Sequence, residues 1–270
     1  MTILATESLT RCFGTLTAVN ELSISVNAGE IFGLLGPNGA GKSTVIKMLC
    51  TLLPPTGGTA RVAGFDIRRQ SMDVRRSIGY VPQLLSADGT LTGYENLMVF
   101  AKLYEVPRPE RKSRVNEALD FMGIGTAADR MVREYSGGMI RRLEIAQSML
   151  HRPRMLFLDE PTVGLDPLAR KVVWERIGRL CRDYGTSILL TTHLMEEADQ
   201  LCHRVAIMHN GQIAAIGSPS ELKARIDEGV PGERVSLDDV FIHHTGDQLA
   251  QGEGSYRETS RTRRTARRLS

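Results

Sequence analysis

The sequence predicts an α/β fold with a mostly parallel sheet, helices on both faces of the sheet and an inserted helical region. Three observations lead to this prediction. Short apolar runs such as FGLL, MLFL and SILL recur between helical patterns, as buried parallel strands do. A glycine-rich loop joins the first of these runs to a helix. From about Leu91 to Leu150 the pattern turns helical, which indicates the insertion.

Each further element follows from its local pattern. Alternation in LSISV marks strands between Leu9 and Asn27, and apolar residues three or four apart mark helices. A capping serine and an early proline open the helix SPSELKARI. The other expected strands are EIFGLL, GTARVAG, SIGYVPQ, MLFLDE, SILLTTH and RVAIMHNGQIAAIG. The other expected helices are KSTVIKMLCTLL, GYENLMVFAKLYEV, RKSRVNEALDFMGI, GGMIRRLEIAQSML, PLARKVVWERIGRLCRDYG and SLDDVFIHHTG.

Composition favours a soluble chain with one large domain. The 270 residues are 41% hydrophobic and 24% charged, and no run of about 18 apolar residues is present. We see no export signal at the N-terminus. The four cysteines have no paired spacing, so reduced thiols in a cytosol are expected.

Charge is concentrated at the C-terminus. Six arginines against two glutamates give residues 252–270 a net charge of +4, whereas the whole chain carries +3. The remainder is therefore close to −1, which argues against a nucleic-acid partner. The arginine-rich tail is either a solvated, flexible end or a weak attachment to anionic lipid.

The stretch GPNGAGKS predicts a phosphate-binding loop. It fits G-x-x-x-x-G-K-S, follows an apolar strand and opens a helix, which is the context that this motif requires. Glycines let backbone amides approach phosphate oxygens, and the helix N-terminus adds partial positive charge. Lys42 can reach the β- and γ-phosphates, and Ser43 can offer a hydroxyl to Mg²⁺. Kinases, GTPases and motors share the motif, so it indicates phosphate binding alone.

Three later strands end in polar side chains. MLFLDE delivers Asp159 and Glu160 to the carboxyl edge of the sheet, where ligands of open α/β folds bind. Asp159 suits the Mg²⁺ shell, and Glu160 could polarise an attacking water; the alternative is that both acids only cap the next turn. His193 and Gln83 end two further strands. They could contact the γ-phosphate, the metal or water, although a lone residue of either kind is more often structural.

The helix start Ser136-Gly137-Gly138 poses a separate question. Two glycines in a first helical turn cost about 1 kcal/mol each relative to alanine. We therefore expect that these two positions need a backbone without side chains.

Taken together, these motifs resemble the nucleotide-binding subunit of ABC transporters over roughly Leu4 to Leu222. They occur in family order: GPNGAGKST, Gln83 as the Q-loop, YSGGM as the signature, LFLDEP, GLD with Asp166 as the D-loop, and TTH with His193 as the switch histidine. Phe13 matches the aromatic residue that stacks on adenine. The complete set is far more specific than any one motif.

The resemblance implies a P-loop ATPase with an antiparallel β region, a helical subdomain over about residues 84–152, and ATP and Mg²⁺ as ligands. Its ATPase domain would span 1–225, followed by a helical extension over 226–251 and the tail at 252–270. The catalytic residues would be Glu160, His193 and Gln83. The metal site would use Ser43, Gln83 and Asp159. The nucleotide would contact Phe13, Gly36, Pro37, Asn38, Gly39, Ala40, Gly41, Lys42, Ser43 and Thr44, together with Ser136, Gly137, Gly138 and Asp166.

The same resemblance implies partners. The signature would face the γ-phosphate of ATP held by a second ATPase subunit in a head-to-tail pair, with a homodimer as the simplest case and a pair with a close relative as the alternative. Separate transmembrane permease subunits would hold the pair at the cytoplasmic face of the membrane. The segment after Gln83, LLSADGTLTGYENLMVF, would receive the permease; its alternative is simple helix packing.

The motif details resemble one branch. YSGGMIRRLEIA, THLMEEAD and LDDVFIHHTG are similar to export-type subunits, including daunorubicin-type resistance pumps. We therefore expect an exporter ATPase for drugs or other hydrophobic compounds. An importer ATPase and a soluble ABC ATPase of translation or DNA repair remain alternatives. The usual signature has Leu and Gln where this chain has Tyr135 and Met139, but Ser-Gly-Gly is intact.

Overall fold

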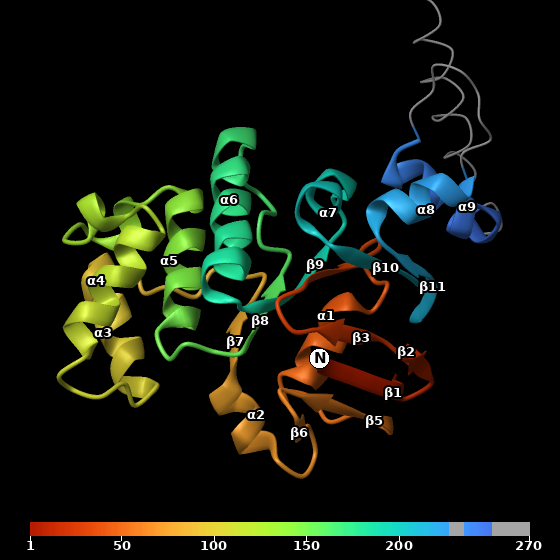
Figure 1. Cartoon of the computed structure of the whole chain (residues 1–270), viewed down its shortest axis with the longest axis horizontal. Helices are drawn as coiled ribbons and strands as arrows, with labels where there is room; N and C mark the ends of the chain where they lie inside the picture. The colour runs from red at the N-terminus through yellow and green to blue at the C-terminus, as the bar shows by residue number, and fades with distance from the viewer. Residues whose placement is uncertain (227–234, 250–270) are drawn as a thin grey trace, which may run out of the picture.

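The computed structural model describes residues 1–226 and 235–249, which form a mixed sheet, an antiparallel sheet at the lower edge of the molecule in Figure 1, and helices packed around the mixed sheet. The arginine-rich tail lies outside the described residues. Within the described part of the chain, no helix has the length and apolar character needed to cross a bilayer.

The mixed sheet has the strand order β11-β10-β4-β9-β8-β7. Neighbours from β10 to β7 pair in parallel, and β11 pairs antiparallel to β10. Every residue of β4, β8 and β9 is buried, which explains their continuous apolar runs. The strands are β4 (Ile31–Leu35), β7 (Ile78–Val81), β8 (Met155–Asp159), β9 (Ser187–Thr192), β10 (Arg204–His209) and β11 (Gln212–Gly217).

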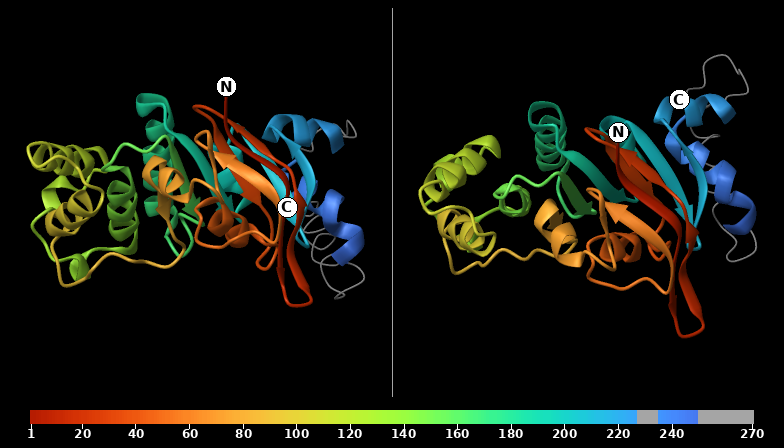
Figure 2. Two further views of the ribbon diagram at one scale, coloured as in Figure 1. Left: turned by 90° about the horizontal axis from the view of Figure 1, so that it is seen from below. Right: turned by 60° about the horizontal axis from the view of Figure 1, so that its bottom comes forward.

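The antiparallel sheet is formed by the N-terminal third of the chain. Its centre is β1, which pairs with β2, β3 and β5, and the β1–β2 hairpin projects from the body (Figure 2). The strands are β1 (Thr2–Phe13), β2 (Leu16–Leu22), β3 (Ser25–Asn27), β5 (Gly57–Val62) and β6 (Phe65–Asp66).

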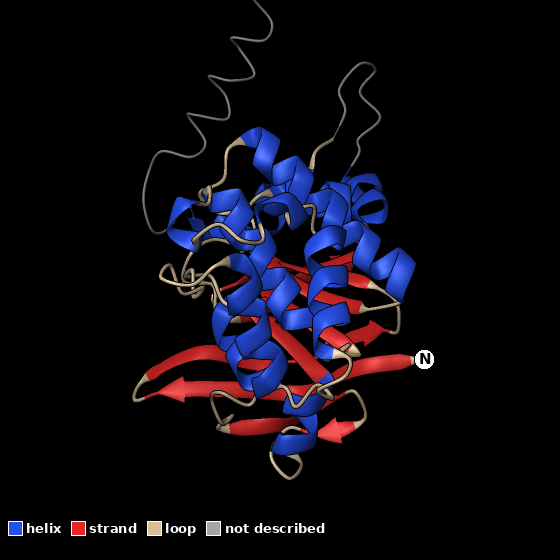
Figure 3. Cartoon of the chain, turned by 90° about the vertical axis from the view of Figure 1, so that its left-hand side faces the viewer, coloured by secondary structure: helices blue, strands red, loops and turns tan. Residues whose placement is uncertain are grey.

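The helices gather in groups around the sheets (Figure 3). Helices α3, α4 and α5 lie together at one end of the molecule, and α8 and α9 lie at the other, beside β11 (Figure 1). The helices are α1 (Lys42–Leu49), α2 (Ser71–Ser77), α3 (Gly93–Leu103), α4 (Arg111–Phe121), α5 (Gly137–Met149), α6 (Pro167–Tyr184), α7 (Met195–Leu201), α8 (Pro219–Ile226) and α9 (Leu237–Leu249). Short 3₁₀ turns occupy Gly125–Ala127 and Val132–Glu134.

Alternate residues of the central strands pack into two different hydrophobic cores. Leu156, Leu158 and Leu190 face a cluster built with the helices of the α5–α7 region, whereas Phe157 and Leu189 face a cluster with α1 and the antiparallel sheet. Helices lie on both faces of the mixed sheet, as expected, with α1 on the face opposite to the α5–α7 region. The antiparallel sheet shares the face of α1, because the N-terminal strands bring their own apolar side to it.

Most predicted elements are confirmed, including the helix SPSELKARI with its Ser218 cap. The segment RVAIMHNGQIAAIG, which was expected as strand, forms two antiparallel strands, β10 and β11. The strand expected from Leu9 begins at Thr2. Helices α2 and α7 were not predicted as elements. Each has seven residues, which is too short for a clear helical period.

Candidate functional site

Four adjacent strands bring the predicted residues to one edge of the sheet. In spatial order β4, β9, β8 and β7 lead into the P-loop, His193, Asp159-Glu160 and Gln83. All four strands run parallel, so their carboxyl ends meet at this edge.

The loop between β4 and α1 is packed so tightly that two of its glycines have no room for a side chain. A Cβ on Gly36 would lie 2.3 Å from the Met208 carbonyl oxygen, and one on Gly41 would lie 2.4 Å from that of Ala18. Gly41 also has φ 103°, a left-handed conformation that favours glycine. It precedes Lys42 at the start of α1, so backbone amides and the lysine share one cradle.

Asp159 and Ser43 form the hydroxyl–carboxylate pair expected of a Mg²⁺ site. The Ser43 hydroxyl donates to Asp159 Oδ1 at 2.9 Å, and the Thr191 hydroxyl donates to the same oxygen at 2.6 Å. Asp159 is 2% exposed. Hard oxygen ligands beside a phosphate cradle suit Mg²⁺, which is commonly held by one or two protein groups together with phosphates and water.

Glu160 is the point where three other predicted residues meet. Lys42 Nζ lies 3.2 Å from Glu160 Oε1, while His193 Nδ1 and Gln83 Nε2 lie 3.2 and 3.3 Å from Oε2. Lys42 also donates to the carbonyls of Gly36 and Pro37. The Lys42 and Glu160 side chains are almost fully buried, whereas His193 is exposed. The arrangement holds a carboxylate at the mouth of a phosphate cradle.

The backbone at Glu160 is unusual for a residue with a side chain. Its φ is 50°, in the left-handed region, and its N–H donates to both the carbonyl and the hydroxyl of Thr191. On the neighbouring strand, burial and then the charge of Asp159 raise the pKa of Tyr80 to about 12. Tyr80 therefore remains a neutral phenol near Asp159.

The signature and the D-loop lie beside each other, away from the Lys42 cluster. Ser136 caps α5 by accepting from the Met139 N–H, and Asp166 caps α6 by accepting from Leu168 and Ala169. Across the described residues, no hydrogen bond or ion pair joins these two caps to Lys42, Ser43 or Glu160.

The two signature glycines differ in their surroundings. A Cβ on Gly138 would lie 2.8 Å from the Ala169 Cβ, so packing against α6 within the chain explains the absence of a side chain there. A Cβ on Gly137 would meet only Leu165, at an ordinary 3.5 Å. Ser136 and Gly137 are both exposed. Both glycines were expected to leave the backbone of the turn bare, and Gly138 is also needed for the close packing of α5 against Ala169.

Comparison with known proteins places this arrangement in a family. The ABC transporter family model matches residues 19–163, more than half of the chain. The chain belongs to the ABC transporter family. It is 44% identical to the daunorubicin/doxorubicin resistance ATP-binding protein DrrA of Streptomyces peucetius over 248 residues, which are 92% of this chain and 74% of that protein.

Two further comparisons agree with this assignment. The Nod factor export ATP-binding protein I of Paraburkholderia xenovorans (strain LB400) is 43% identical over 218 residues, 81% of this chain and 71% of that protein. A solved ATP-binding subunit of an ABC transporter matches with a TM-score of 0.78 and 29% identity, covering 90% of this chain and 99% of that one. The chain is thus an ABC ATPase of the drug-resistance exporter branch.

The adenine-stacking residue expected of an ABC ATPase, Phe13, ends β1 and is 44% exposed. The Arg11 guanidinium carbon lies 4.5 Å from the centroid of its ring, a cation–π contact. The ring is therefore supported and still has accessible surface.

Sequence reasoning missed two polar groups of this ATPase. Thr191 holds Asp159 and the Glu160 backbone, as described above. Glu197 on α7 is 1% exposed and accepts from Thr162 Oγ1 at 2.6 Å and from Trp174 Nε1 at 2.9 Å. The signal for Thr191 was a polar pair inside an apolar strand, TT before His193. Glu197 gave no signal, because a second acid in MEEAD is typical of a solvated helix face.

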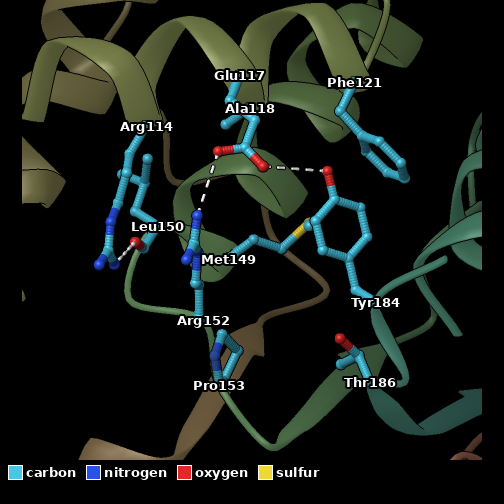
Figure 4. A pocket seen from close by; sticks show the side chains of 10 residues that line it. All are labelled: Arg114, Glu117, Ala118, Phe121, Met149, Leu150, Arg152, Pro153, Tyr184 and Thr186. Carbon is cyan, nitrogen blue, oxygen red and sulfur yellow. Dashed lines mark hydrogen bonds and ion pairs between the residues drawn. The ribbon is translucent and has the colours of Figure 1, made fainter. Parts of the chain in front are cut away.

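A cavity of about 150 Å³ lies elsewhere in the ABC ATPase, between α4 and the ends of α5 and α6 (Figure 4). The Glu117 carboxylate lies in its lining and accepts two hydrogen bonds, from Arg152 Nη2 at 3.5 Å and from the Tyr184 hydroxyl at 3.3 Å. Pro153 and Thr186 in its lining precede β8 and β9, so it lies toward the amino ends of the strands. The cavity is therefore separate from the phosphate cradle.

Proposed function

We propose that two copies of this ATPase bind and hydrolyse MgATP at shared sites, and that this cycle drives separate permease subunits of an exporter. The single observation that carries the proposal is the convergence of Lys42, His193 and Gln83 on Glu160, next to the Ser43–Asp159 pair. A phosphate cradle, a metal-type ligand pair and a base together match the parts needed for γ-phosphoryl transfer to water.

The residues take distinct roles in this proposal. Lys42 would leave Glu160 for the β- and γ-phosphates of arriving ATP, which frees the carboxylate to accept a proton from the attacking water. His193 would contact the γ-phosphate, and Gln83 would orient the water. Ser43, Asp159 and the Gln83 side chain would hold Mg²⁺, which when bound neutralises charge on the phosphate oxygens. Phe13 would stack on the adenine, while residues 36–44 would surround the phosphates.

The other half of each site would come from the partner. Ser136 and Gly137 are exposed at the N-terminus of α5, outside the Lys42 cluster of their own chain. A helix N-terminus with accessible amides suits an anion. In a twofold pair, the Ser136–Gly138 turn and Asp166 of one chain would therefore close over the ATP held by the other.

The exporter role and its partners follow from relatives of this chain. One relative confers daunorubicin and doxorubicin resistance, and another serves Nod factor export. We propose drugs or other hydrophobic compounds as the cargo class. We also propose attachment to the cytoplasmic face of the membrane through the permease, with the segment LLSADGTLTGYENLMVF at residues 84–100 as the receiving part. The exposed Leu84 and Leu85 support that placement.

Mixing two damaged chains tests the shared site. One chain carries Lys42→Ala, and the other carries Gly137→Asp, which puts a negative charge where a phosphate oxygen would approach. Gly137 is preferred to Gly138 because its Cβ would meet only Leu165 at 3.5 Å. Glu160→Gln in both chains slows escape of bound nucleotide. The heterodimer, isolated with two tags, should trap one ATP, and each parent homodimer almost none.

The control is Gly137→Ala in place of Gly137→Asp, because it adds the Cβ without the charge. Mixed with Lys42→Ala, it should trap at least as much ATP as the Asp variant does. If folded, paired heterodimers trapped no more ATP than the parents, the signature would not act on the partner's nucleotide and the proposal would fail.

A further inference from the structure

Helix α5 carries a polar stripe that is buried instead of solvated. Arg141, Glu144 and Gln147 recur every three residues, so they share one face, and their exposed fractions are 2%, 3% and 3%. Charged residues are almost never fully buried unless they are paired. The stripe begins three residues after the signature glycines, and it faces the segment that follows β7.

Arg141 holds the backbone of the Q-loop. Its Nη1 donates to the Pro82 carbonyl and its Nη2 to the Gln83 carbonyl, both at 2.7 Å. The side chain of Gln83 lies against Glu160 at 3.3 Å. Arg141 thus fixes the main chain of a residue whose amide contacts the proposed catalytic base.

Glu144 completes the attachment from the other side of the segment. Its Oε2 pairs with Arg141 Nη1 at 3.1 Å, and its Oε1 accepts from both the backbone N–H and the hydroxyl of Ser86. The Ala87 N–H contributes a further bond to the carboxylate. The pair therefore anchors the segment at Pro82–Gln83 and again at Ser86–Ala87.

The stripe continues through Gln147 to α3. Gln147 Nε2 donates to Asn96 Oδ1 at 3.5 Å, and Asn96 bonds both the N–H and the carbonyl of Asp88. From Pro82 to Asp88 the main chain is thus held by side chains of α5 and α3, while Leu84 and Leu85 are left 82% and 53% exposed.

Fold stability alone does not explain the pair. A buried ion pair often contributes less to stability than apolar residues of the same volume, because both charges lose their water. Burial accordingly lowers the pKa of Arg141 and raises that of Glu144, even though each charge partly offsets the other. What the pair does supply is a fixed geometry between the signature helix and Gln83.

We propose that Arg141 and Glu144 are positioning residues, which hold Pro82–Ala87 on the signature helix so that Gln83 keeps its place against Glu160 when that helix closes on the partner's nucleotide. This inference rests on the proposed function, because it needs the signature and Gln83 to serve two different ATP sites. It makes the path Glu144–Arg141–Gln83–Glu160 the mechanical link between those sites.

Kinetics of the full chain test the link. Glu144→Ala should lower kcat for ATP by about 10–100-fold, the range expected when a positioned group shifts by about 1 Å. KM should stay within about twofold, because neither Phe13 nor the P-loop touches the pair. Glu144→Gln keeps an oxygen for the Ser86 N–H and should recover part of kcat. Glu134→Ala is the matched control, because it removes a glutamate from the exposed Arg130 pair; it should change neither constant.

A double-mutant cycle separates positioning from general loss of structure. If Glu144 acts through Gln83, adding Glu144→Ala to Gln83→Ala should lower kcat by less than about twofold. The proposal would be overturned if Glu144→Ala lowered kcat as much in the Gln83→Ala background as it does in the parent. It would also be overturned if Glu144→Ala left kcat unchanged, or raised KM by as large a factor as it lowered kcat. If Glu144→Ala fails to fold, the cycle is measured with Glu144→Gln and Gln83→Ala instead.

A probe that needs no nucleotide keeps this test independent of the proposed function. A spin label at Leu85→Cys, in a Cys12→Ser background, should be ordered in the parent and mobile in Glu144→Ala, with Glu134→Ala like the parent. An equally ordered label in Glu144→Ala would overturn the link. Loss of trapping in the mixed-chain experiment, with the label behaving as expected, would instead count against the shared ATP site.

Discussion

Removing the carboxylate of Glu197 should be among the more destabilising single changes in this ATPase. Glu197 joins three parts of the site region: Thr162 just after Glu160, Thr192 just before His193, and Trp174 on α6. In Glu197→Ala the indole N–H of Trp174, which can only donate, loses its acceptor in a residue that is 7% exposed.

The expected size follows from these contacts. An orphaned buried donor costs about 1–3 kcal/mol and a lost buried methylene about 0.8 kcal/mol, so the unfolding free energy should fall by about 2–4 kcal/mol. Glu197→Gln keeps an oxygen acceptor and should cost about 1 kcal/mol or less at neutral pH. Glu196→Ala, its exposed neighbour, should stay within about 0.5 kcal/mol of the parent.

The same residue predicts a pH dependence. Burial, opposed by the hydrogen bonds from Thr162, Thr192 and Trp174, raises the pKa of Glu197 above its ordinary 4.5. Between 4.5 and the raised value the folded state keeps a proton that the unfolded state has lost. The parent should therefore lose stability relative to Glu197→Gln as pH rises through this window, by up to about 1.4 kcal/mol per unit.

Urea unfolding followed by circular dichroism measures these differences. For a slope of about 2–3 kcal/mol/M, Glu197→Ala should move the midpoint by about 1 M. The parent and Glu197→Gln are then compared at pH 5 and pH 7.5. The reasoning would be refuted if Glu197→Ala matched Glu196→Ala, or if the gap between the parent and Glu197→Gln did not change with pH.

Two further predictions concern the nucleotide. Glu160→Gln should keep ATP binding, because Lys42 and the P-loop remain, but lower turnover by about 10²–10⁴-fold in a steady-state assay; near-normal turnover would contradict its role as the base. Phe13→Ala should weaken ATP binding by about 5–150-fold with kcat unchanged, since stacking on a base contributes about 1–3 kcal/mol. Because every base has a stacking face, titrations with GTP should show a similar loss; an unchanged dissociation constant for both nucleotides would exclude stacking on this ring.

Residues of the phosphate site could be predicted because each lies within a local pattern. In a parallel sheet the carboxyl ends of all strands lie at the same edge. Asp159, Glu160, Gln83 and His193 each follow or end a strand, so they were expected at that common edge. Their contacts with one another needed the strand order, which the sequence does not show. Glu160 meets Lys42 across the end of β9, which lies between β4 and β8.

The buried polar groups could not be predicted for a different reason. Along α5, Arg141 and Glu144 have the spacing of a solvated i, i+3 pair, and periodicity does not show whether such a face meets water or another segment. Their partners at Pro82–Ser86 are more than fifty residues away in the chain. Gly138 shows the same limit, because Ala169, which excludes a side chain there, belongs to another helix.

The position of β9 also bears on how the chain acquires its site during synthesis. β9 is the fourth strand of the order β11-β10-β4-β9-β8-β7, yet it is made only at residues 187–192, long after β4 and after both β8 and α6. A nascent chain that ends before Ser187 holds the P-loop and the acidic pair on strands with no common neighbour. Insertion of β9 supplies both parallel pairings at once and brings Lys42 to Glu160. Such late, non-local closure is slow, and it leaves the apolar edges of β4 and β8 open to wrong partners until the ribosome has passed this strand.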